Sequence, residues 1–136
     1  HFSAIAINAV KELSTDGIST FSFIKNIETA YTAADIIISR AGAIAISELC
    51  VIGKPVILIP SPNVAENHQF KNAQSLVNKN AALLVKDSQA NDKLVLKIIS
   101  LKNDSQLMKE LSVNIKTMEA KEASSIIASH AMSLIK

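Results

Sequence analysis

Residues 35–60 read DIIISRAGAIAISELCVIGKPVILIP, and this stretch decides the fold class. Its two short apolar runs, residues 36–38 and 56–59, are typical of strands buried on both faces of a sheet. The segment between them, residues 42–52, has a helical composition and is followed by Gly53, a residue type that commonly ends helices. A strand, a helix and a second strand in this order predict a crossover unit and therefore a parallel sheet with both strands at its centre.

The same alternation continues on both sides of this stretch. We expect helices at residues 1–13, 26–34 and 67–79, strands at 18–24 and 81–85, and a helical region from 87 with breaks near 103–104 and at about 118. This order predicts one α/β domain over residues 1–136, with a Rossmann-like, doubly wound parallel sheet. Because no strand precedes the first helix, we expect that the sheet lacks its first strand and that the chain is part of a longer protein.

The composition excludes several classes of function. With a net charge of +2 and 4% aromatic residues, the chain has neither the basic surface nor the stacking side chains of a nucleic-acid-binding protein. The single cysteine, Cys50, excludes a disulfide framework and a thiolate zinc site. We also expect no other metal and no cofactor, since Asn72 is a poor ligand to pair with His68. No apolar run reaches the length of a membrane span, and we expect no leader peptide.

Common phosphate-binding and nucleophile motifs are also missing. The only glycines are Gly17, Gly42 and Gly53, so neither a Walker loop nor a G-x-G-x-x-G fingerprint is present. There is no G-x-S-x-G nucleophile elbow either.

Ligands of open parallel sheets bind beyond the carboxyl ends of the strands, close to helix N-termini. The junction at residues 39–43 is the most informative. We expect Gly42 to allow a tight turn that leaves the following amides facing an anion or a sugar. Glu48, farther along this helix, could accept two hydrogen bonds from the vicinal hydroxyls of a ribose. The alternative is that Ser47 and Glu48 only mark the solvent side of the helix.

Arg40 and the loop after the strand at residues 56–59 are the other candidates. Arg40 is the only arginine, and a guanidinium suits a phosphate, a carboxylate or a structural ion pair, here with Asp35 or Glu48. The long loop at residues 60–68 follows an expected buried strand, and residues 63–69 are mostly polar, so this loop is expected to offer hydrogen bonds to a ligand.

Two segments carry a family resemblance. AYTAADIIISRAGAIAISEL at residues 30–49, and GKPVILIP at 53–60 with ENHQFKNA at 66–73, strongly resemble the MurG family. Its members are N-acetylglucosaminyltransferases that move N-acetylglucosamine from UDP-N-acetylglucosamine onto lipid I, giving lipid II in peptidoglycan synthesis. The likeness is close over residues 23–86 and looser in the flanking helices.

The resemblance implies a role for particular residues. Members have two Rossmann-like halves, an arrangement called GT-B, and the C-terminal half binds the donor nucleotide. By position, Ile24 would contact the uracil through its backbone, Glu48 would bind the ribose hydroxyls, and Gln69 with His68 would face the sugar. The helix residues implied to line the ribose and phosphates are Ala43, Ile44, Ala45, Ile46, Ser47 and Glu48, with Arg40 and Gly42 as further candidates. The chain departs from the family pattern at Ala41, often Ser, and lacks the Gly-rich diphosphate loop.

The resemblance also implies partners and a location. Lipid I would bind to an N-terminal half outside these residues, so we expect no catalytic residue here and no activity of this chain alone. The complete protein would be a peripheral protein on the cytoplasmic face of the bacterial inner membrane. A sheet edge left by the absent strand could pair with a second copy. Two alternatives are a donor domain of a related lipid glycosyltransferase, such as a galactosyl-diacylglycerol synthase, and a non-catalytic donor-binding subunit that needs a partner.

Overall fold

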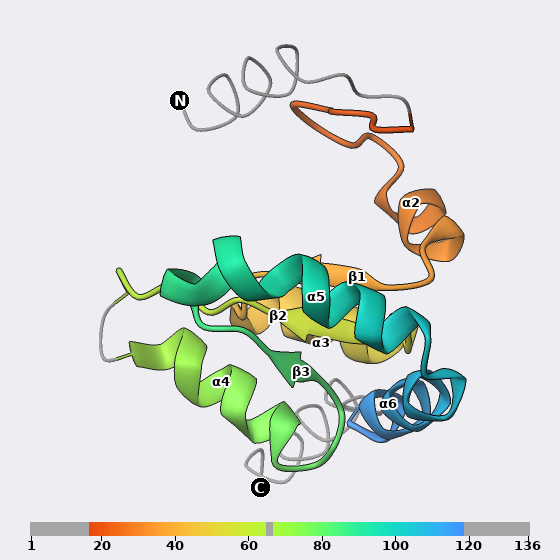
Figure 1. Ribbon diagram of the computed structural model, residues 1–136. Coiled ribbons are helices and arrows are strands. Elements are labelled where there is room, and N and C mark those ends of the chain that lie inside the picture. Colours follow the sequence, from red (N-terminus) through yellow and green to blue (C-terminus); the bar gives the residue numbers. More distant parts are fainter. Residues whose placement is uncertain (1–16, 65–66, 119–136) are drawn as a thin grey trace, which may run out of the picture. The chain divides into compact units, whose positions relative to one another are not determined.

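A computed structural model describes residues 17–64 and 67–118 (Figure 1). The chain divides into two compact units, His1–Ala33 and Ala34–Lys136, which are described separately. The helix expected at residues 1–13 lies outside the described residues.

The described part of the first unit contains one helix, α2 (Ile27–Ala33), close to the helix expected at residues 26–34. The strand expected at residues 18–24 is wrong, because this segment is an exposed, irregular stretch. Phe21 and Phe23 are 68% and 78% exposed. Aromatic and β-branched residues favour strands only where a neighbouring strand and a buried face are available, and no described strand pairs with this segment.

The second unit contains a three-stranded parallel sheet. Its strands are β1 (Ile37–Ser39), β2 (Val56–Leu58) and β3 (Leu83–Leu84), in the order β1-β2-β3. Ser39 is in register with Leu58. The expected α/β architecture with two parallel strands is therefore confirmed; β2 lies within the expected range 56–59, and β1 is shifted by one residue from the expected range 36–38.

The expectation that both strands are central and doubly buried is correct only for β2. Its three residues are fully buried. In the described chain β1 lies at the edge of the sheet, and Ile38 is 45% exposed. An edge strand has a neighbour on one side only, so its outward residues lack the cover that a second neighbour provides.

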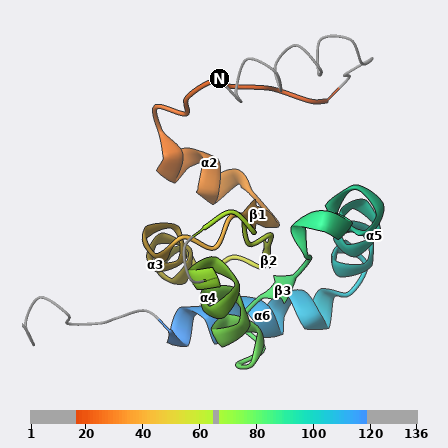
Figure 2. The ribbon, with the colours of Figure 1, turned by 90° about the vertical axis from the view of Figure 1, so that its left-hand side faces the viewer.

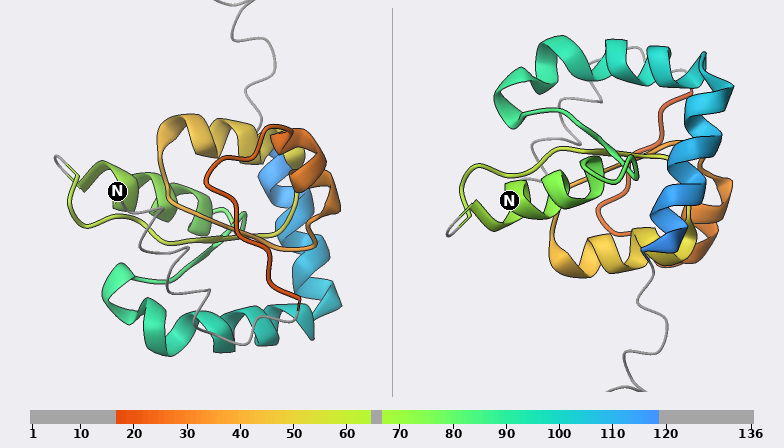
Figure 3. Two further views of the ribbon diagram at one scale, coloured as in Figure 1. Left: turned by 90° about the horizontal axis from the view of Figure 1, so that it is seen from above. Right: turned by 90° about the horizontal axis from the view of Figure 1, so that it is seen from below.

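Helices cover both faces of this sheet, as a doubly wound fold requires. α3 (Ala43–Ile52) and α4 (His68–Val77) lie on one face, and α5 (Ala90–Lys102) lies on the other (Figures 2 and 3). Two crossovers of the same hand that step in the same direction place their helices on one face, which explains why α3 and α4 are neighbours. α6 (Ser105–Thr117) packs against both α3 and α5.

The second unit has a buried apolar cluster, and α6 begins and ends near the expected breaks. Ile57 of β2 packs with Val85, Leu101 and Leu111 in a buried cluster between the sheet, α5 and α6. The break expected at residues 103–104 is confirmed, since Asp104 caps α6 by accepting a hydrogen bond from the Leu107 amide at 2.9 Å. The break expected near residue 118 coincides with the end of α6.

Candidate functional site

The loops that follow β1 and β2 leave the same edge of the sheet. The register continues past both strands, because the Ile59 amide donates to the Ser39 carbonyl at 2.9 Å. β1 then leads to α3 through Arg40, Ala41 and Gly42, and β2 leads to α4 through a longer loop. The starts of α3 and α4 therefore meet at the carboxyl edge, as the sequence predicted.

Gly42 is the N-cap of α3 and has φ −69° and ψ 148°. Any residue can adopt this conformation, so the tight turn expected of a glycine here is wrong. A Cβ atom built on Gly42 would meet nothing within 4 Å, and no side chain caps the helix at this position. The glycine thus leaves open space beside the first amides of α3, where the helix dipole favours a negative charge.

The first two turns of α3 present a mixed face to solvent. Ala43, Ile44, Ser47 and Glu48 are exposed, whereas Ala45 and Ile46 are half-buried. Ile44 is 79% exposed, an unusual position for a large apolar side chain. The Ser47 hydroxyl donates to the Ala43 carbonyl within the helix at 3.1 Å. The implied ligand-binding residues of this helix therefore include four that a ligand could reach from solvent.

Arg40 is engaged with other parts of the protein. Its Nη1 donates to the Ile59 carbonyl at 3.1 Å and forms an ion pair with the Asp87 carboxylate. The sequence suggests Asp35 or Glu48 as the partner of a structural ion pair, whereas the partner in the structure is Asp87. Asp87 begins the short helix η2 (Asp87–Gln89), soon after β3. The strands are parallel, so the segments that follow all three of them leave the same edge of the sheet. Arg40, after β1, can therefore reach Asp87, after β3.

Gln69 and His68 form the first turn of α4. The Gln69 Oε1 accepts a hydrogen bond from the Ser61 amide at 2.9 Å, which ties α4 to the start of the loop after β2. The side-chain oxygen of Gln69 is therefore occupied by a partner within the protein. The side-chain Nε2 group is the donor that Gln69 can present to a ligand. His68 is exposed.

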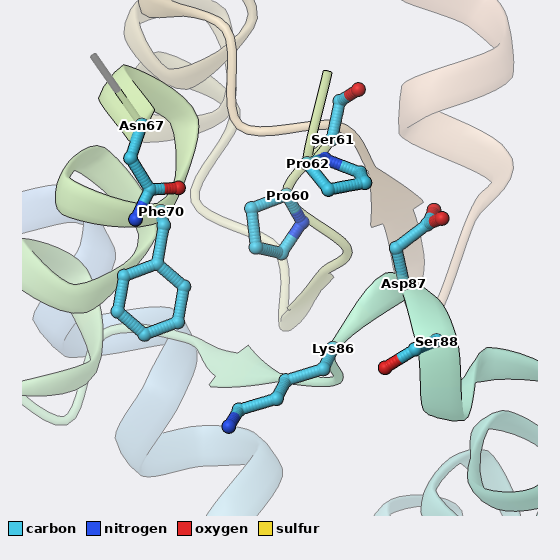
Figure 4. A pocket seen from close by; sticks show the side chains of 8 residues that line it. All are labelled: Pro60, Ser61, Pro62, Asn67, Phe70, Lys86, Asp87 and Ser88. Carbon is cyan, nitrogen blue, oxygen red and sulfur yellow. The ribbon is translucent and has the colours of Figure 1, made fainter. Parts of the chain in front are cut away.

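A groove of about 410 Å³ lies beside this turn (Figure 4). Phe70 of α4 stands on one side, Asp87 and Ser88 of η2 stand on the other, and Pro60 lies between them. The full lining is Pro60, Ser61, Pro62, Asn67, Phe70, Lys86, Asp87 and Ser88. Four of these residues belong to the loop after β2 that was expected to offer hydrogen bonds, whereas none of the residues that the resemblance implies for donor binding lines this groove. The signal that could have found it is the polar run Lys86-Asp87-Ser88 directly after the apolar run at residues 81–85.

Most of the chain matches a known protein family. Residues 2–127 match the model of the glycosyltransferase family 28 C-terminal domain, which is most of the chain. The chain belongs to this family. The match runs through both compact units, so the matched residues include α2 as well as the sheet.

Individual members of the family are close in sequence. The chain is 46% identical over 121 residues to a UDP-N-acetylglucosamine--N-acetylmuramyl-(pentapeptide) pyrophosphoryl-undecaprenol N-acetylglucosamine transferase of Flavobacterium psychrophilum, covering 89% of the chain and 33% of the relative. It is 52% identical over 106 residues to the transferase of the same name in Phocaeicola vulgatus, covering 78% and 28%. The chain thus spans about a third of the length of the curated relatives it matches.

The fold of the glycosyltransferase domain is also known. The structure resembles the crystal structure of Acinetobacter baumannii MurG with a TM-score of 0.75 and 26% sequence identity, covering 85% of this chain and 33% of that one. This likeness confirms the expected GT-B C-terminal domain fold.

Three further expectations concern the uracil contact, metal binding and membrane-spanning helices. Ile24 lies in the first unit, so its contact with uracil stays a prediction. In residues 17–64 and 67–118 no three His, Cys, Asp or Glu side chains are grouped so that they could hold a metal ion. Within the same described ranges, no helix is long and apolar enough to cross a membrane.

Proposed function

We propose that the complete protein transfers N-acetylglucosamine from UDP-N-acetylglucosamine to lipid I, giving lipid II, and that this chain binds the donor. The observation that carries the proposal is the open N-terminus of α3 beside the first turn of α4. The chain is also 46% and 52% identical to the two N-acetylglucosamine transferases described above. Both helix starts lie at the carboxyl edge, where parallel sheets bind nucleotides.

The residues divide among the parts of the donor. The first amides of α3 and its dipole would stabilise the diphosphate, because helix N-termini favour anions. Glu48 would accept hydrogen bonds from the two ribose hydroxyls. The Gln69 amide, with His68, would face the sugar, and backbone groups at Ile24 would contact the uracil.

The proposed reaction replaces one bond at the sugar. A hydroxyl of lipid I attacks the anomeric carbon, UDP leaves with the electrons of the broken bond, and the hydroxyl proton passes to a base. The start of α3 would stabilise the negative charge that develops on the leaving diphosphate. We place the base and the lipid site outside these 136 residues, so the chain itself contributes donor binding and leaving-group stabilisation.

Three further features belong to the same proposal. Residues 1–136 would form one donor-binding domain, which the family match across both units supports. The protein would act as a peripheral protein at the cytoplasmic face of the inner membrane, where lipid I is available. A second copy bound at the edge of β1 stays a prediction, which sedimentation of the purified protein at several concentrations would check.

The test uses the complete protein, UDP-N-acetylglucosamine labelled in the sugar, and purified lipid I. The proposal expects labelled lipid II and no product with labelled UDP-galactose. Transfer from UDP-galactose to diacylglycerol would instead make it a related lipid glycosyltransferase. Activity that appears only after a second protein is added would identify a donor-binding subunit.

A further inference from the structure

Arg40 precedes the N-cap of α3 by two residues, yet its guanidinium does not serve as a cap. Nη1 donates to the carbonyl oxygen of Ile59, after β2, and pairs with the carboxylate of Asp87, after β3. These partners are 19 and 47 residues away in the chain. One side chain therefore connects the segments that follow all three strands.

Ala41, the residue after Arg40, is attached to α4. Ala41 is fully buried, and its carbonyl oxygen accepts a hydrogen bond from Asn72 Nδ2 of α4 at 3.1 Å. Two successive residues before Gly42 are thus fixed, one toward η2 and one toward α4. Gly42 has no side chain to hold the start of α3, so these two attachments act on the segment directly before its first amides.

We propose that Arg40 is a positioning residue for nucleotide-sugar binding, acting through Asp87, and that it does not contact the phosphates. The inference rests on the proposed function, in which the start of α3 holds the diphosphate. Asp87 offsets the charge of Arg40, so a phosphate would have to compete with a carboxylate that belongs to the protein.

The size of the effect follows from exposure. The side chains of Arg40 and Asp87 are 55% and 36% exposed. Exposed ion pairs are weak, so loss of the pair should reduce affinity by about two- to fivefold rather than abolish binding.

A double-mutant cycle in the complete protein tests this with UDP as the ligand. Arg40→Met, Asp87→Asn and the double variant are compared by calorimetry and by steady-state kinetics. We expect each single variant to raise the Kd of UDP and the KM of UDP-N-acetylglucosamine by about the same two- to fivefold, and the double variant to be no worse than either. The KM of lipid I should not change in any variant. Asp87→Glu, which keeps the carboxylate, should bind the donor nearly as tightly as the parent. Asp92→Asn in α5 is the matched control, since it removes the same charge at an exposed position.

Two results would overturn the proposal. If Asp87→Asn binds UDP as tightly as the parent or more tightly while Arg40→Met loses affinity, Arg40 touches the phosphates directly. If the losses add in the double variant, the two residues act independently.

A readout without ligand separates this proposal from the proposed function. The Ile46 amide donates to the Gly42 carbonyl at 2.9 Å, the first hydrogen bond of α3. We expect both single variants to speed hydrogen exchange of this amide while leaving β2 amides unchanged. A parent protein that fails to bind UDP would refute the proposed function alone. Unchanged exchange at Ile46 in both variants would refute the positioning role.

Discussion

Asn72 on α4 donates a hydrogen bond to the carbonyl oxygen of Ala41, 31 residues earlier in the chain. The bond is partly buried and joins α4 to the segment that leads from β1 into α3. A helix side chain thereby satisfies a loop carbonyl that no strand or helix partner reaches, as buried backbone groups require.

Asn72→Ala should therefore destabilise the fold and disturb the site together. Loss of a hydrogen bond that leaves a buried carbonyl unpaired costs about 1–3 kcal/mol. Thermal unfolding measures the stability, and titration with UDP measures the site. Ser75→Ala, on the same helix but exposed, should be neutral in both. A melting temperature for Asn72→Ala equal to that of Ser75→Ala would show that the bond to Ala41 contributes nothing.

The glycines at the two ends of α3 should respond differently to alanine. Gly53 has φ +67°, and a Cβ there would lie 2.8 Å from Cγ of Lys116, so Gly53→Ala should destabilise by about 1 kcal/mol or more. At Gly42 the reduced entropy of the unfolded chain favours alanine, whereas alanine is a poor N-cap, so the net change in stability should stay within about 1 kcal/mol.

Donor binding should show the opposite order for the same two variants. A methyl group at Gly42 would occupy the space through which a diphosphate approaches α3, so Gly42→Ala should weaken UDP binding markedly. Gly53→Ala, at the far end of the helix, should not. Unaltered UDP affinity in a folded Gly42→Ala protein would exclude the start of α3 as the phosphate site.

The central unit of the fold could be predicted from the continuous apolar runs of its strands, although only β2 is buried throughout. Doubly buried strands need continuous apolar runs, and Gly53 and the polar loops mark their ends. The segment at residues 18–24 is also rich in β-branched and aromatic residues, but a strand exists only with a hydrogen-bonded neighbour. That requirement is tertiary and leaves no local trace in the sequence.

The location of the site could be predicted from the sequence, but its side-chain contacts could not. The edge at which α3 and α4 begin follows from the parallel order of the strands. The partner of Arg40 does not, because Asp87 is 47 residues away and reaches it only through the position of β3. The groove beside Phe70 depends on how the loop after β2, α4 and the segment at residues 86–88 pack, so the polar run at 86–88 could mark the segment but not the groove itself.

The complete protein should bind UDP more tightly than ADP. Backbone groups near Ile24 are proposed to match the uracil edge, and loss of one or two hydrogen bonds would weaken ADP by about tenfold. Ile24→Ala should then have little effect, whereas Ile24→Pro, which removes the amide donor, should abolish the preference. Calorimetric titrations with both nucleotides make the comparison. Equal affinities in the parent would count against uracil recognition.

This chain alone should not form lipid II from UDP-N-acetylglucosamine and lipid I. Transfer requires both substrates in one geometry, and the chain spans about a third of its relatives. Radiolabel transfer to lipid, beside the complete protein as positive control, measures this. Sustained turnover by the chain would place an acceptor site and a base within it, with His68 as the first residue to replace.

Glu48→Ala in the complete protein should weaken donor binding far more than it weakens folding. Glu48 is exposed in the second turn of α3, and hydrogen bonds to a charged group contribute about 1.5–3 kcal/mol, or about a ten- to hundredfold loss in donor affinity or kcat/KM. A glutamate that only marks the solvent face would change stability by less than about 0.5 kcal/mol and leave kinetics unaltered.

Two further variants make the test of Glu48 decisive. Glu48→Gln should be intermediate, because an amide keeps one acceptor and loses the charge. Glu110→Ala is the matched control, since it removes an exposed carboxylate from α6. Donor kinetics and thermal melting are measured for all three. If KM and kcat of Glu48→Ala stay within about twofold of the Glu110→Ala values, a difference of less than about 0.5 kcal/mol, Glu48 does not bind the ribose.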